Sequence, residues 1–114
     1  MNTRLLEPAA IDAGFVPRFR TEVVAIPVED EAVLYEEDTG RLHQLDPIAT
    51  IVSGCFDGEA SIATTVGELV AAFGADAAVI EVDVLDLARR FGRLGLLEGV
   101  RGDEFPDEVD PVEC

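Results

Sequence analysis

The first half of the chain carries short apolar runs separated by polar segments. Runs rich in β-branched and other apolar residues predict three strands, at 22–28, 32–36 and 41–45. The intervening segments are polar, and the second contains Gly40, which is free to take a positive φ in a turn. Pro27 favours an edge position for the first strand. Two hairpins in series would form an antiparallel meander, and so small a sheet needs a helical layer to cover it.

The third predicted strand leads directly into a helix. Asp46 can accept hydrogen bonds from the first free N–H groups of that helix, and Pro47 suits the first helical position. We expect the helix to run from about 47 to 56 and to stop at 57–58, where the sequence is Asp-Gly. Its apolar residues recur at helical spacing and predict one buried face, which consists of Ile48, Ile51, Val52 and Cys55.

Two more helices complete the predicted helical layer. Ser61 can cap the second helix, which Gly74 would end, and Asp76 can cap the third. The third helix is the longest, running to about Leu94 with Gly95 just beyond it. The core positions predicted on the two helices are Ile62, Val66, Leu69, Phe73, Ile80, Val84, Leu87, Phe91 and Leu94.

The third predicted helix has a second stripe of side chains. Val82 and Leu85 lie about 100° or more around the helix from its core face, and Arg89 and Arg93 continue their line. A helix packed between two layers needs two apolar faces, which is one interpretation. The other is a groove wall that is apolar at one end and cationic at the other. Arg89, Arg90 and Arg93 are three of only eight positive residues, and this favours the groove.

The two ends of the chain fall outside this pattern. Residues 1–16 show no clear period and predict a flexible N-terminal arm. The apolar residues that could attach it to the domain are Ile11, Phe15 and Val16. Residues 100–114 are acidic and interrupted by prolines, which is typical of a disordered tail. One domain is therefore expected over residues 17–99.

The composition is strongly acidic. Twenty-four Asp and Glu residues against eight arginines and no lysine give a formal net charge of −16. Such a chain repels phosphate backbones and anionic membranes, so neither nucleic acid nor a membrane is an expected partner. No apolar run approaches the length of a membrane span, and residues 1–20 lack the pattern of a signal peptide. A cytoplasmic location is expected.

The sequence contains little that would support catalysis. His43 is the only histidine, so a histidine metal cage or a Ser-His-Asp triad is not expected. Two cysteines, Cys55 and Cys114, make no disulfide framework, and Cys55 is best interpreted as a small core residue. A Cys55–His43 pair is conceivable, but a thiolate on an apolar helix face would be costly. We therefore expect a binding protein without metal or cofactor.

Three segments together resemble the PqqD-like family of small peptide-binding proteins. They are the strand-to-helix junction at 42–52 with its turn at 57–58, the second helix at 61–73, and the third helix with its ending at 82–97. The resemblance covers about residues 20–98. It implies an α+β, winged helix-turn-helix-like fold, in which a three-stranded antiparallel sheet packs on three helices. Asp46 stands where the family often has asparagine, and Thr65 occupies a commonly aliphatic position.

The resemblance also implies a function and a site. Members act as recognition elements that bind the leader of a ribosomally made precursor peptide (RiPP recognition elements) and present it to a modifying enzyme. Such an enzyme could be a radical S-adenosylmethionine enzyme, a protease or a cyclase. The leader would add as a strand beside the third strand and dock on the third helix. The implied peptide-binding residues are Arg41, Leu42, His43, Gln44, Leu45, Val82, Leu85, Asp86, Arg89 and Arg93. The arginines would suit an acidic leader.

Two other functions are compatible with the sequence. A DNA-binding winged helix needs a basic recognition helix, but Glu81, Asp83 and Asp86 accompany the arginines on the third helix. An adaptor could dock on an enzyme without holding a peptide. The protein could be a monomer, or a homodimer paired through the edge of its third strand.

Overall fold

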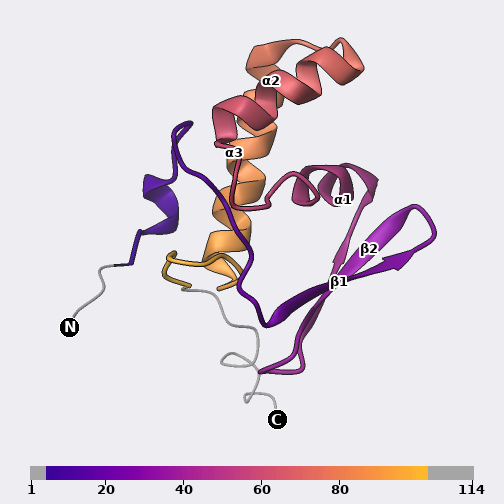
Figure 1. Cartoon of the computed structure of the whole chain (residues 1–114), viewed down its shortest axis with the longest axis vertical. Coiled ribbons are helices and arrows are strands. Elements are labelled where there is room, and N and C mark those ends of the chain that lie inside the picture. Colours follow the sequence, from indigo (N-terminus) through magenta and orange to yellow (C-terminus); the bar gives the residue numbers. More distant parts are fainter. Residues whose placement is uncertain (1–4, 103–114) are drawn as a thin grey trace, which may run out of the picture.

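Three strands, three α-helices and one 3-10 turn make up the part of the chain that the computed structural model describes, residues 5–102 (Figure 1). In chain order they are η1 (Pro8–Ala10), β1 (Val23–Val28), β2 (Glu31–Glu36), β3 (Leu42–Leu45), α1 (Pro47–Ser53), α2 (Ile62–Phe73) and α3 (Ala77–Arg93). The predicted α+β class, with a three-stranded antiparallel sheet and three helices, is confirmed. Residues 103–114 of the predicted tail, Cys114 among them, lie outside the described residues.

The sheet is the predicted meander. Its strands lie in the order β1-β2-β3, and both neighbouring pairs are antiparallel. Each strand begins within one residue of its predicted start. Gly40 takes a φ of 81° in the second turn, as its residue type allows, while Glu29 takes 58° in the first. β2 is the central strand, so β1 and β3 both carry an open edge.

The helices begin at the predicted capping residues. The side chains of Asp46, Ser61 and Asp76 each accept a hydrogen bond from a backbone N–H two or three residues further on. Gly74 ends α2 in the left-handed conformation, with a φ of 66°. These local signals therefore placed all three helix starts correctly.

α1 is shorter than predicted, and its buried face is different. It ends at Ser53 rather than about residue 56, because the next residues continue as tighter turns in which Cys55 and Phe56 donate to carbonyls three residues back. Phe56 thereby turns into the core, and Cys55 is half-buried in the turn.

The prediction that Ile48 and Ile51 are buried on α1 is wrong. They are 67% and 46% exposed, because this short helix packs inward through Ala49 and Val52 instead. Phe73, predicted to be buried on α2, is likewise 60% exposed.

Three aromatic rings pack together from the segment before β1, the turns after α1, and α3. The ring centroid of Phe19 lies 5.3 Å from that of Phe91 and 6.1 Å from that of Phe56, and the last two are 6.2 Å apart. Phe91 lies on the predicted core face of α3, which also buries Val84 and Ala88. Figure 1 shows α3 as the long axis on which the other layers are built.

The described part of the N-terminal arm packs along α3. Ile11 is fully buried, as expected for a residue that attaches the arm, whereas Phe15 is half-buried and Val16 is 42% exposed. Gly92 makes room for both Val100 and the arm, because a Cβ there would lie 2.9 Å from Val100 Cγ1 and 3.4 Å from Ile11 Cδ1. The arm is thus held more closely than its irregular sequence suggested, because side chains that follow no period can still fill a surface on α3.

Thr65 is fully buried in α2, and its hydroxyl has no hydrogen-bond partner within the described part of the chain. A buried polar group without a partner costs stability. We expect Thr65→Val, which keeps the shape and removes the hydroxyl, to raise the free energy of unfolding by about 1 kcal/mol. Urea denaturation would measure the change. Thr64→Val on the exposed side of the same helix is the control: the Thr64 hydroxyl already accepts a hydrogen bond from Ser61 Oγ over 3.1 Å, so no gain is expected there, and an equal gain would contradict this explanation.

Candidate functional site

The open edge of β3 presents backbone groups to solvent. Residues opposite each other in an antiparallel pair alternate between bonded and non-bonded positions. Glu36 N–H donates to the Arg41 carbonyl over 2.9 Å, so this pair is a bonded one. The alternation then directs the N–H and C=O groups of Leu42 and Gln44 away from β2, toward the open edge. The edge can therefore pair with an added strand.

The opposite edge, on β1, is less suited to pairing. Glu37 N–H donates to the Glu22 carbonyl, and the same alternation turns Val23, Ala25 and Pro27 outward. Pro27 has no N–H to offer, which fits the predicted edge position of β1, and Val23 N–H already donates to the Arg20 carbonyl. Of the two edges, only that of β3 offers two successive outward N–H groups.

The side chains of the predicted β3 segment divide between the two faces of the sheet. Leu45 is buried beneath α1, and Arg41 and His43 lie on the same inner face, half-buried. Leu42, at 63% exposure, and Gln44 point to the outer face. All five predicted residues therefore lie along the open edge, and their side chains alternate between the inner and the outer face of the sheet.

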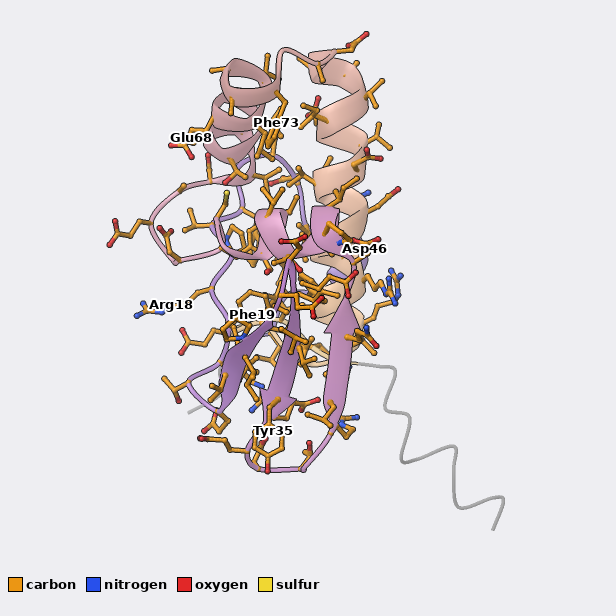
Figure 2. All side chains as sticks on the ribbon, turned by 90° about the vertical axis from the view of Figure 1, so that its right-hand side faces the viewer. Arg18, Phe19, Tyr35, Asp46, Glu68 and Phe73 are labelled. Atoms are coloured by element: carbon orange, nitrogen blue, oxygen red, sulfur yellow. The ribbon has the colours of Figure 1, made fainter. Side chains whose placement is uncertain are left out.

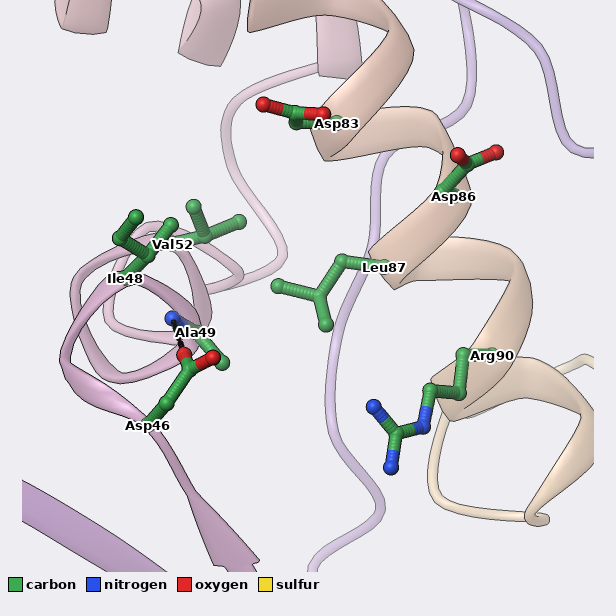
Figure 3. A pocket seen from close by; sticks show the side chains of 8 residues that line it. All are labelled: Asp46, Ile48, Ala49, Val52, Asp83, Asp86, Leu87 and Arg90. Atoms are coloured by element: carbon green, nitrogen blue, oxygen red, sulfur yellow. Dashed lines mark hydrogen bonds between the residues drawn. The ribbon is translucent and has the colours of Figure 1, made fainter.

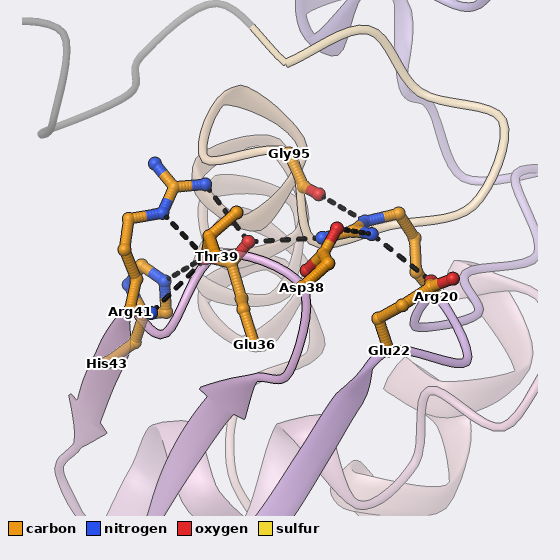
Figure 4. Close-up of polar contacts among 8 residues, drawn as sticks. All are labelled: Arg20, Glu22, Glu36, Asp38, Thr39, Arg41, His43 and Gly95. Carbon is orange, nitrogen blue, oxygen red and sulfur yellow. Dashed lines mark hydrogen bonds and ion pairs between the residues drawn. The ribbon is translucent and has the colours of Figure 1, made fainter.

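A buried carboxylate fixes the inner side of this edge (Figure 4). The Glu36 side chain is fully buried and accepts hydrogen bonds from Arg41 Nη2 over 3.0 Å and Arg20 Nη2 over 3.1 Å. His43 Nε2 lies 2.6 Å from the second carboxylate oxygen. Arg20 Nε in turn donates to the Gly95 carbonyl over 2.7 Å. The cluster ties β3 to β2 and to the end of α3.

These contacts set the ionisation of Glu36. Burial would raise the pKa of its carboxyl group, but hydrogen bonds from His43 and Arg41 and the attraction of their charges outweigh burial, so the pKa is lowered. Neither Glu36 nor Arg20 was among the predicted site residues. Glu36 follows Ala32 and Leu34 at every second position of a buried strand face, and that alternation is the signal that could have revealed it.

A hollow of about 210 Å³ lies where β3 ends, between α1 and α3 (Figure 3). Leu87 points from α3 across it toward α1. The residues that line it are Asp46, Ile48, Ala49, Val52, Asp83, Asp86, Leu87 and Arg90. The hollow is therefore apolar at its floor, and it carries three carboxylates against one guanidinium.

The predicted stripe of α3 divides between two surroundings. Val82, 57% exposed, and Asp86 lie on the open side of the helix. Arg89 instead faces the N-terminal arm, where its Nη2 donates to the Ile11 carbonyl over 2.8 Å and its Nε over 3.2 Å. Leu85 packs against the core, and Arg93 is half-buried in the last turn. Asp83, Leu87 and Arg90 line the hollow, but they were not among the predicted peptide-binding residues.

Both interpretations of the second stripe thus have a part in the structure. Arg89, on one side of the stripe, packs under the N-terminal arm, as expected for a helix between two layers. It leaves Val82 and Asp86 open beside the hollow, as a groove wall would. The prediction that Leu85 and Arg89 contact a peptide stays a prediction.

The described residues offer no reactive thiolate or metal site. Burial raises the pKa of the Cys55 thiol, and the nearby charges of Glu68 and Asp57 raise it further. Between residues 5 and 102 no group of three His, Cys, Asp or Glu side chains could hold a metal ion. Within the same range no helix is both long and apolar enough to span a membrane.

Known proteins are similar to this chain in sequence and in fold. The family model described as coenzyme PQQ synthesis protein D (PqqD) matches residues 31–97. A PqqA binding protein of Xanthomonas oryzae pv. oryzae is 44% identical over 57 residues, which are 50% of this chain and 62% of that relative. A PqqA binding protein of Xanthomonas euvesicatoria is 49% identical over 47 residues, 41% of this chain and 51% of the relative. The match thus spans less than two thirds of each curated relative.

Two solved structures have the same arrangement. The solution structure of the PqqD part of Methylobacterium extorquens PqqCD, described as a stand-alone RiPP recognition element, superposes with a TM-score of 0.69 at 28% identity. The superposition covers 80% of this chain and 97% of the PqqD chain. TbiB1 in complex with the TbiA(beta) leader peptide superposes with a TM-score of 0.65 at 26% identity, over 72% of this chain and 95% of that one.

Proposed function

The chain belongs to the PqqD family, and from this premise we propose that it binds the leader segment of a ribosomally made precursor peptide and presents it to a modifying enzyme. The names of its relatives support the proposal, because they are described as binding PqqA, as a RiPP recognition element and as a complex with a leader peptide. The class of enzyme proposed is one that modifies peptides, such as a radical S-adenosylmethionine enzyme, a protease or a cyclase.

The open edge of β3 is the observation that carries the proposal. A peptide strand added there would pair with the outward backbone groups of Leu42 and Gln44. On its inner side it would meet the hollow between α1 and α3. We therefore place the peptide along Arg41–Leu45, with α3 as the second wall. Of the predicted residues on α3, Val82 and Asp86 are exposed and could contact the peptide directly. Leu85, Arg89 and Arg93 lie farther around the helix, and Arg89 is already bonded to the arm.

A role without catalysis is part of the same proposal. The single histidine supports it, because His43 Nε2 is engaged by the buried Glu36 carboxylate. Cys55 supports it too, because burial raises the pKa of its thiol and so disfavours the reactive thiolate. The proposed chemistry then belongs to the partner enzyme, and this chain contributes affinity and position.

Backbone amide shifts of the isotope-labelled protein would test the proposal. The probes are the PqqA peptide of Xanthomonas oryzae, the TbiA leader, and the leader halves of short peptides encoded beside this gene. We expect at least one probe to shift the amides of Arg41–Leu45 together with those of 82–90 on α3. Shifts confined to other surfaces, or none with any probe, would contradict it. Salt-dependent binding of duplex DNA would instead favour a winged-helix regulator.

A further inference from the structure

A second hollow, of about 230 Å³, lies between α1, α2 and α3 and is almost wholly apolar. Three large side chains at its mouth are unusually exposed for their type, namely Ile48, Ile51 and Phe73 at 67%, 46% and 60%. Its floor is formed by buried or half-buried residues of the same helices, Val52, Leu69 and Ile80. In Figure 2 Phe73 lies toward the helical end of the molecule, far from Tyr35 at the sheet end. Contiguous exposed apolar side chains of this kind mark a binding surface.

The two hollows lie next to each other, and we call them together the groove. Ile48, Val52 and Asp83 line both of them. The groove begins at Asp46, directly after β3, and ends at Phe73 on the last turn of α2. A peptide paired with β3 that continues past Leu45 would therefore enter the helical part of the groove. Nothing in residues 5–102 covers that part, as the exposure of its three rim residues shows.

The charges along the groove indicate which peptide would fit. Asp46, Asp83 and Asp86 line its β3-proximal part against Arg90 alone. Asp46 is partly compensated, since its carboxylate accepts the Ala49 N–H over 2.7 Å. Asp83 and Asp86 are both exposed on α3, on the side of the hollow opposite α1 (Figure 3). Two such carboxylates attract a cation and repel another carboxylate.

We propose that the peptide bound by this protein carries two features in the segment beyond the Leu45 end of β3. One is a large apolar side chain that fills the hollow between Ile51 and Phe73. The other is a neighbouring lysine or arginine that faces Asp83 and Asp86. This inference rests on the proposed function and adds the chemistry of the ligand to it. It differs from the acidic leader expected from the arginines of α3, because Arg89 is bonded to the arm and Arg90 alone lines the hollow.

Selection from a display library of random 16-residue peptides on the intact protein would test the proposal. We expect the enriched peptides to combine a strand-forming segment with a large apolar residue and a lysine or arginine at a constant spacing from it. Enriched peptides that are acidic in this segment, or that lack an apolar preference, would overturn the inference while leaving the proposed function intact. A library without any enrichment would contradict the proposed function itself, and the inference with it.

Matched substitutions would then locate the two features on the protein. Ile51→Ala and Phe73→Ala should each weaken a selected peptide by about tenfold, since each removes apolar area that the peptide buries. Ile26→Ala on β1, 42% exposed and outside the groove, should change the affinity little. Asp83→Asn with Asp86→Asn should weaken binding several-fold and flatten its salt dependence, whereas Glu81→Gln on the same helix should not. Equal effects of a variant and its control would overturn the assignment of that feature.

Discussion

Glu36→Gln is expected to lower the free energy of unfolding by about 3 kcal/mol, the usual cost of removing one partner from a buried ion pair. The side chain is fully buried, and Arg20, Arg41 and His43 all converge on its carboxylate. Glutamine keeps the size but removes the charge, and its NH₂ group cannot accept from a guanidinium. Chemical denaturation monitored by circular dichroism would measure the loss.

Glu37→Gln is the matched control, because Glu37 is the next residue and is exposed. A change of at most about 0.5 kcal/mol is expected there. If the two variants were equally stable, the cluster would contribute nothing to the fold.

The stabilisation from Glu36 should depend on pH in a defined direction. The pKa of Glu36 is lowered in the folded protein from an ordinary value of 4.5. A lowered pKa means that the stabilisation is complete above that ordinary value and is lost as the pH falls through the folded-state pKa. The difference in stability between the wild type and Glu36→Gln should therefore shrink as the pH falls below that ordinary value. A difference that grew on acidification would contradict the assigned direction of the shift.

Much of the fold could be predicted because its signals are local. Asp46, Ser61 and Asp76 each cap a helix with their own side chains, so a few residues of sequence suffice to find each start. Alternation and turn residues likewise placed the strands to within one residue. The end of α1 was missed because Phe56 leaves the helix for a core built from Phe19 and Phe91, residues distant along the chain.

The candidate site was harder to predict, because the orientation of its side chains is set by residues that are distant along the chain. Helical spacing gives the angle of Arg89 around α3, but the carbonyl it binds belongs to Ile11, 78 residues away. Ile48 and Ile51 have the spacing of a core face, yet Ala49 and Val52 take the inward positions because the sheet and α3 lie on that side. Spacing thus identifies apolar stripes correctly but cannot tell a core face from a groove. In this protein Ile48 and Ile51 were assigned to the core for this reason, although they line the groove.

Gln44→Pro is expected to weaken binding of a leader peptide by about 10- to 100-fold. The alternation of β3 turns the Gln44 N–H toward the open edge, where an added strand would accept from it. Proline removes that donor, leaves a peptide carbonyl without its partner, and places its ring in the path of the incoming strand. The β2–β3 ladder should survive, because this N–H takes no part in it. Isothermal titration with a peptide that binds the wild type would measure the loss.

Ala25→Pro on β1 is the control that separates an effect on binding from an effect on the sheet. Ala25 lies at an equivalent outward position of the opposite edge, and the neighbouring outward residue of that strand is already Pro27. Both substitutions restrict the backbone of an edge strand in the same way, so they should cost similar stability, while only Gln44→Pro should weaken the peptide. If Ala25→Pro weakened it equally, the peptide would not be pairing with β3, and the groove beyond Leu45 would then have to bind it without an added strand.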